Sequence, residues 1–262
     1  MKQITEFLST KVVQSKIKAT NKTLRDIIVS EIKRLGNEAD LNHIDVSEVD
    51  DMEHAFVDLA DFNGDISKWN TSKMTIARYM FYNCHKFDGD LSNWDTSSLV
   101  SARNMFYECN SFTGISIENW KVNNLENAGS MFGECWEFKA DLSRWDIKKL
   151  KIASYMFLSC DHFNCDLSGW DVSNVEHANN MFYECKKFNK SLNDWNLAKC
   201  NNADSMFAAC KSFCKDISDM YIPSSCSVNA FFSNCEKMRK HPTWWPSTVR
   251  ETAKIRGIYY IF

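Results

Sequence analysis

The chain has 262 residues, of which 44% are hydrophobic and 25% are charged, and its formal net charge is −3. This composition is typical of a folded protein and argues against a disordered or collagen-like chain. With 31 basic and 34 acidic residues, the chain has no overall positive field for holding nucleic acid. It contains no run of about 18 apolar residues that could span a membrane. Its first residues, MKQITEFLSTKVVQSK, lack the apolar core and the cleavage site of a secretion signal.

The first predicted element is a helix over residues 21–36. Its apolar residues recur three or four positions apart and share one face, and Gly36 follows as a stop signal. These residues are Leu24, Ile27, Ile28, Ile32 and Leu35. An amphipathic helix at this place can cover the end of the fold that follows, so we expect residues 1–36 to form an N-terminal helical cap.

A repeat of 25 residues, with one step of 26 between Phe112 and Phe138, occupies most of the remaining chain. Its phenylalanine column is Phe62, Phe87, Phe112, Phe138, Phe163, Phe188 and Phe213, continued by Met238. Its tryptophan column is Trp69, Trp94, Trp120, Trp145, Trp170 and Trp195. Its cysteine column is Cys84, Cys109, Cys135, Cys160, Cys185, Cys210 and Cys235. A degenerate first unit has Ile44 and Leu59 in the tryptophan and cysteine places. The sequence therefore predicts eight units over residues 37–237.

Within one unit the hydrophobic period changes. Leu167, Trp170 and Val172 suit a short extended stretch, whereas later apolar residues are spaced three to four apart, which is typical of a helix. Those later residues are Val175, Ala178, Met181, Phe182 and Cys185. A unit this short cannot bury its own apolar side, but stacked units can. We therefore expect an α/β solenoid, similar to leucine-rich repeats, in which each coil has a short parallel strand and a short helix.

The last predicted element is a C-terminal cap over residues 238–262. Its aromatic and aliphatic residues are numerous enough to cover the last coil: Trp244, Trp245, Tyr259, Tyr260, Ile261 and Phe262. A docking site on this aromatic tail is the alternative interpretation.

The units resemble a known family. The pattern F-N-x-D-[IL]-S-x-W-D-V-S-x-V followed by M-F-x-x-C, seen in the unit from Phe163 to Cys185, is similar to the BspA-like repeat of bacterial surface proteins and mycoplasma lipoproteins. This repeat is a divergent relative of leucine-rich repeats. The resemblance covers residues 35–240 and implies a solenoid that contacts proteins or surfaces rather than an enzyme.

Eleven cysteines could indicate metal or redox chemistry. However, the column cysteines stand one coil apart with parallel side chains, farther apart than a disulfide prefers, and no zinc-binding spacing occurs. We expect buried free thiols that behave as small hydrophobic groups, which favours a reducing compartment. The cysteines outside the column are Cys165, Cys200, Cys214 and Cys226.

Two acidic columns raise the question of calcium. One contains Asp65, Asp90, Asp141, Asp166 and Asp216, and the other Asp45, Asp95, Asp146 and Asp171, with Asn70 and Asn196. Because the glycine-rich turns of calcium-binding repeats are absent, we favour carboxylates that hydrogen-bond their own turns. No cofactor or metal is expected.

The six histidines fall in unrelated columns, and no nucleotide-binding glycine motif occurs. The aromatic columns could imitate a base-stacking platform, but they repeat like a core and lack a basic stripe. We therefore predict a protein without enzymatic activity that binds a protein partner inside a cell or a virus particle, of bacterial or phage type. The alternative is a surface adhesin of the BspA-like kind.

A partner would bind to surface columns that vary between units. Arg78, Tyr82, Arg103 and Tyr107 combine cationic and aromatic side chains on two consecutive units, and both types are common interface anchors. We predict that they bind the partner. A merely solvated face is the alternative for each single column.

Overall fold

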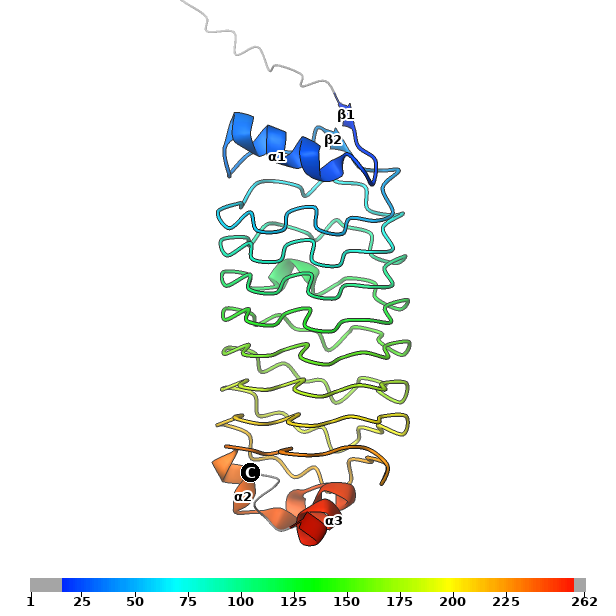
Figure 1. Cartoon of the computed structure of the whole chain (residues 1–262), viewed down its shortest axis with the longest axis vertical. Helices are drawn as coiled ribbons and strands as arrows, with labels where there is room; N and C mark the ends of the chain where they lie inside the picture. The colour runs from blue at the N-terminus through cyan, green and yellow to red at the C-terminus, as the bar shows by residue number, and fades with distance from the viewer. Residues whose placement is uncertain (1–15, 257–262) are drawn as a thin grey trace, which may run out of the picture.

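The structure is a computed structural model that describes residues 16–256. Figure 1 shows the chain as a stack of coils along the long axis, with α1 at one end and α2 and α3 at the other. Between them the chain forms successive coils of about one repeat each. Among the described residues, no helix has the length and apolarity needed to cross a membrane.

The N-terminal end consists of β1 (Ile17–Lys18), α1 (Leu24–Leu35) and β2 (Ile44–Asp45), and β1 pairs in parallel with β2. The structure confirms the helix predicted over 21–36. Leu24 and Ile28 are buried, whereas Leu35, expected on the same face, is 39% exposed. Leu35 is the last residue of the helix, where the chain turns away at Gly36.

The helix predicted in each unit is absent, and this is the main correction to the sequence-based fold. Between residues 37 and 235 the only helical element is η1 (Ile115–Ile117). The segment from Ala77 to Cys84 is instead a chain of turns, in which Met80 N–H bonds to Ala77 O and Cys84 N–H bonds to Phe81 O.

The alternate amides of this segment bond to the next coil. The N–H groups of Ala77 and Tyr79 reach the carbonyls of Ser101 and Arg103, each at 2.9 Å. In a helix each amide would bond to the carbonyl four residues earlier in the same coil, and none would bond to the next coil. Here half of them join the coils, and Tyr79 adopts a left-handed φ of 55°. The same left-handed backbone recurs in every coil at His54, Asn104, Ser130, Tyr155, Asn180, Ser205 and Ala230.

The strand predicted in each unit is also largely absent. Besides β1 and β2, the described chain pairs only through isolated bridges, such as Ile76 with Ser101 and Asn127 with Ile152. All of these bridges are parallel, so the coils run in the same direction although no continuous sheet forms.

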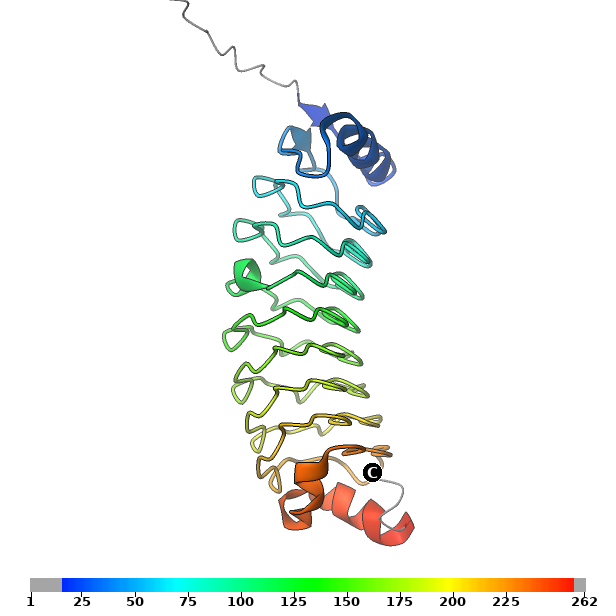
Figure 2. The same ribbon diagram turned by 90° about the vertical axis from the view of Figure 1, so that its left-hand side faces the viewer.

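The core lies inside the coils. The column residues are buried, and their rings stack from coil to coil: Trp69 and Trp94 have centroids 6.1 Å apart at an interplanar angle of 7°. The buried structural ladder contains Trp69, Trp94, Trp120, Trp145, Trp170, Trp195, Cys84, Cys109, Cys135, Cys160, Cys185 and Cys210. The unit with one extra residue accommodates it in η1, which projects from the convex side of the gently bowed stack in Figure 2.

The C-terminal end is covered by α2 (Glu236–Arg239), η2 (Pro242–Trp244) and α3 (Ser247–Arg256). Trp245 is buried against Phe232, with ring centroids 5.6 Å apart, and its indole N–H bonds to Met238 O. This contact places Trp245 against the last coil, whereas the cap predicted over residues 238–262 stays a prediction. The expected cap residues Tyr259, Tyr260, Ile261 and Phe262 lie outside the described residues.

Candidate partner-binding face

The turn segments of successive coils form one face of the stack. In the segment from Ala77 to Cys84, the side chains of residues 77, 80, 81 and 84 are buried, and those of residues 78, 79, 82 and 83 are partly exposed. The Arg25 guanidinium of α1 donates to the carbonyls of His54 and Val57 in the first of these segments. In Figure 2, α1 lies on the side opposite η1, so this face belongs to the concave side of the stack.

Aromatic rings gather on this face over the first three turn segments. His54 stacks on Tyr79 with centroids 5.2 Å apart, and Tyr82 stacks on Tyr107 at 5.2 Å with an interplanar angle of 9°. Tyr79 and Tyr82 join the two pairs at 5.6 Å. We call His54, Tyr79, Tyr82 and Tyr107 the tyrosine cluster. Rings held against one another lose little further freedom on binding, which suits an interface anchor.

The two predicted arginines lie beside this cluster, but both have internal partners. Arg78 Nη2 is 2.8 Å from Glu53 Oε2, and the guanidinium of Arg103 lies over the ring of Tyr79 at 5.9 Å. The structure thus brings all four predicted residues to one face. The charge of Arg78 is neutralised by Glu53, so the aromatic rings are the more available part of the predicted site.

His54 and Tyr79 are not among the residues predicted from the sequence. Their column changes residue type in almost every unit, and only its left-handed backbone, invisible in the sequence, places these side chains at the surface. The 25-residue step from His54 to Tyr79 was the available signal.

A glycine in the fourth segment sets the position of Tyr107. A Cβ atom added at Gly133 would lie 2.8 Å from Cδ2 of Tyr107, so the ring rests on the bare backbone of the next coil. Burial raises the pKa of Tyr107, and Glu134 and Glu108 raise it further. Tyr82 has a raised pKa for the same main reason, with added effects of Glu108 and Asp58.

The aspartates of the two acidic columns accept hydrogen bonds from residues of their own turns. Asp95 Oδ1 accepts hydrogen bonds from the hydroxyl of Ser97 at 2.6 Å and from its backbone N–H at 3.0 Å, and these bonds lower the pKa of Asp95. The same contact to the residue two positions later is made by Asp45, Asp65, Asp90, Asp141, Asp166, Asp171 and Asp216. Within residues 16–256, no three His, Cys, Asp or Glu side chains are placed to hold a metal ion.

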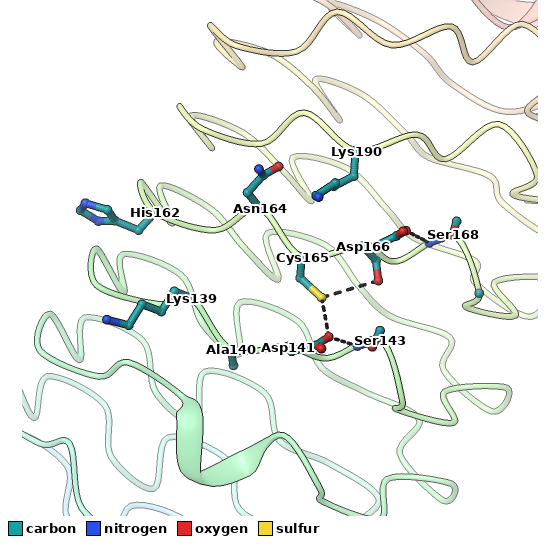
Figure 3. A pocket seen from close by; sticks show the side chains of 11 residues that line it. Lys139, Ala140, Asp141, Ser143, His162, Asn164, Cys165, Asp166, Ser168 and Lys190 are labelled. Atoms are coloured by element: carbon teal, nitrogen blue, oxygen red, sulfur yellow. Dashed lines mark hydrogen bonds between the residues drawn. The ribbon is translucent and has the colours of Figure 1, made fainter.

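A pocket of about 600 Å³ on another part of the surface contains a half-buried cysteine (Figure 3). Lys139 and Lys190 line it, and the thiol of Cys165 donates to Asp141 Oδ1 at 3.4 Å. Burial raises the pKa of Cys165 to about 12, which leaves a poor nucleophile at neutral pH. His162 points away from this thiol in Figure 3, so the two do not form a catalytic pair.

The family profile described as "Mycoplasma protein of unknown function, DUF285" matches residues 26–145 and 127–245. The chain belongs to the DUF285 family. No curated protein matches the sequence. A crystal structure of a leucine-rich repeat protein from Bacteroides ovatus is similar over 75% of this chain and 85% of that one, at 11% identity and a TM-score of 0.26.

The two DUF285 matches together cover the coils and parts of both ends. The same family profile thus matches two successive parts of the coiled region. The tyrosine cluster lies within the first match. The family description assigns no function to it.

Proposed function

We propose that this DUF285 protein is a non-enzymatic scaffold that binds a protein partner through the face carrying the tyrosine cluster, Arg78 and Arg103. The supporting observation is the run of stacked rings on consecutive coils. Tyrosine and arginine provide much of the binding energy in protein interfaces, and stacked repeats spread recognition over several units.

The proposal extends to the fold and the cellular setting. We regard the stack as a BspA-like solenoid of the leucine-rich-repeat type, modified by turn segments in place of helices. Eleven cysteines without a disulfide among them favour a reducing compartment, inside a cell or a virus particle.

The test is an affinity capture from the native host with mass spectrometry. It compares the wild type with a variant in which Arg78, Tyr82, Arg103 and Tyr107 are replaced by Ala. The matched control replaces four exposed residues of other columns, Asn93, Asn119, Lys121 and Arg144, and also removes two positive charges.

We expect one protein to be retained by the wild type and the control and lost by the test variant. The measured affinity should weaken by more than about 2 kcal/mol, with the thermal midpoint nearly unchanged. Retention by the test variant, with loss on removing residues 241–262 from a folded protein, would assign binding to the aromatic tail instead.

A further inference from the structure

Next to the tyrosine cluster runs a column of carboxylates that form no ion pair within residues 16–256. Asp58, Glu108, Glu134 and Glu184 stand in their coils one residue after the position that Tyr82 and Tyr107 occupy, and all have a left-handed backbone, with φ between 59° and 61°. Two of them occupy consecutive coils, since Glu108 N–H bonds to Gly133 O and Glu134 N–H bonds to Leu158 O. We call these four residues the carboxylate column.

Elsewhere on the surface, charges one coil apart neutralise each other. Five ion pairs join residues exactly one repeat apart in sequence: Glu48–Lys73, Glu53–Arg78, Asp61–Lys86, Glu126–Lys151 and Asp161–Lys186, at 2.7–2.8 Å. Within residues 16–256 no ion pair involves a member of the carboxylate column. Its hydrogen-bond donors are neutral: Asn83 to Asp58, Trp136 to Glu134, and Ser159 to Glu184. Lys186 lies near enough to interact with Glu184 and Glu134, but its ammonium is paired with Asp161.

The carboxylates and the tyrosines form one continuous surface. Glu108 and Glu134 lie close enough to Tyr107, and Glu108 and Asp58 close enough to Tyr82, to disfavour a negative charge on the phenol oxygens. An incoming group at this place therefore meets aromatic rings and carboxylates together. That combination attracts cations, because a ring face and a carboxylate both favour positive charge.

We infer that the partner presents lysine or arginine side chains to this surface, along an extended segment that follows the stack axis. The inference rests on the proposed function and specifies the partner's chemistry. Stacked like charges on neighbouring coils repel one another, and a cationic segment would relieve this repulsion on binding. The protein's own Arg78 and Arg103 do not do so, because Glu53 and the Tyr79 ring already engage them.

The inference is tested with a defined probe on the full chain. A fluorescein-labelled decapeptide of alternating lysine and serine is titrated at low salt and followed by fluorescence anisotropy. A glutamate–serine peptide is the charge-reversed probe. The variant E108Q/E134Q removes two unpaired carboxylates, and E48Q/E126Q removes the same charge from glutamates paired with Lys73 and Lys151.

We expect the wild type to prefer the lysine peptide over the glutamate peptide by at least about tenfold. E108Q/E134Q and Y82A/Y107A should each weaken lysine-peptide binding by about tenfold or more, and E48Q/E126Q by less than about twofold. Circular dichroism and thermal midpoints confirm that each variant is folded.

Equal loss in the two glutamine variants would show a general charge effect and overturn the inference. Absence of any preference for the lysine peptide would overturn it as well. If the captured partner binds E108Q/E134Q as tightly as the wild type but not the four-residue alanine variant, the proposed function stands and the cationic partner segment is wrong.

Discussion

The thiol of Cys109 donates a hydrogen bond to the backbone carbonyl of Phe81 in the preceding coil, at 3.0 Å. The bond repeats along the column, from Cys84 to Phe56 at 3.1 Å and from Cys135 to Phe106 at 2.8 Å. The cysteines are therefore more than small apolar groups, because each thiol gives a second hydrogen bond to a buried carbonyl that already accepts an amide of its own turn. The thiol hydrogen bond explains why this column contains cysteine rather than alanine, which is also a small apolar residue.

Replacement of Cys135 by Ala should lower the free energy of unfolding by about 0.5–2 kcal/mol, because the Phe106 carbonyl keeps its amide donor, Cys109 N–H, but loses the thiol bond, and a small cavity forms. Denaturant titration followed by circular dichroism measures the change. Cys214→Ala is the control, since Cys214 is half-buried and outside the column, and it should change stability by less than about 0.5 kcal/mol. Equal effects would contradict a structural role of the thiol bond.

The tryptophan column has a similar polar role, since Trp145 Nε1 donates to Ile117 O at 3.2 Å. Trp145→Phe keeps most of the ring but loses this bond, and should cost about 1–3 kcal/mol. Trp145→Ala also loses the packing and should cost about 3–5 kcal/mol. Guanidinium unfolding of both variants separates the two contributions. A Phe variant as stable as the wild type would show that only the ring matters.

The sequence predicted the columns well because burial recurs with the repeat, whatever the backbone does inside a coil. It could not distinguish a helix from a chain of turns. Ala77, Met80, Phe81 and Cys84 have helical spacing, yet their turns end every two or three residues and send alternate amides to the next coil. Those bonds join residues about 24 positions apart, which a local pattern does not reveal.

The candidate site was only partly predictable for the same reason. Column variation identified Arg78 and Tyr82, and the 25-residue step also relates Glu53 to Arg78. Whether two residues one repeat apart form an ion pair depends on how their side chains are oriented along the stack axis. The structure shows this pair and leaves Glu108 without an ion pair among the described residues.

Thiol reactivity follows from burial. In the native protein, nine cysteines are buried, and only Cys165 and Cys214 are half-buried. Burial raises the pKa of Cys84 to about 12 and that of Cys109 well above its usual range, so few thiolates exist at neutral pH. Protein purified without reductant should show at most two fast-reacting thiols with a thiol-reactive dye and close to eleven after unfolding. A much lower total would indicate disulfides or bound metal.

Acid stability follows from the turn-capping aspartates. The serine hydrogen bonds hold the pKa of Asp95 and Asp171 below the value in the unfolded chain, about 3.9. Their contribution is therefore present above the unfolded pKa and lost as pH falls through the lower folded pKa. The thermal midpoint should be nearly constant from about pH 7 to pH 5 and fall below about pH 4.

The variant D95N/D171N should make this acid-induced decrease shallower. Asparagine keeps the acceptor oxygen without titrating, and Asn70 already accepts the backbone N–H of Ser72 at 3.2 Å. D194N is the control, because no serine cap involves this exposed residue. Thermal unfolding at several pH values measures the slope, and an unchanged slope in D95N/D171N would contradict the capping role.

The turn backbone itself is tested at Ser130, which has a left-handed φ of 54°. Ser130→Gly should leave stability unchanged or raise it by up to about 1 kcal/mol, because glycine adopts this conformation without strain. The helix expected from the sequence would require the opposite, a loss of up to about 1 kcal/mol. Ser130→Val should cost about 1–2 kcal/mol, since its branched Cβ is disfavoured at positive φ. Ser101→Val, at a neighbouring position without positive φ, is the control in the same urea titration. A destabilised glycine variant would favour the helical backbone over the turns.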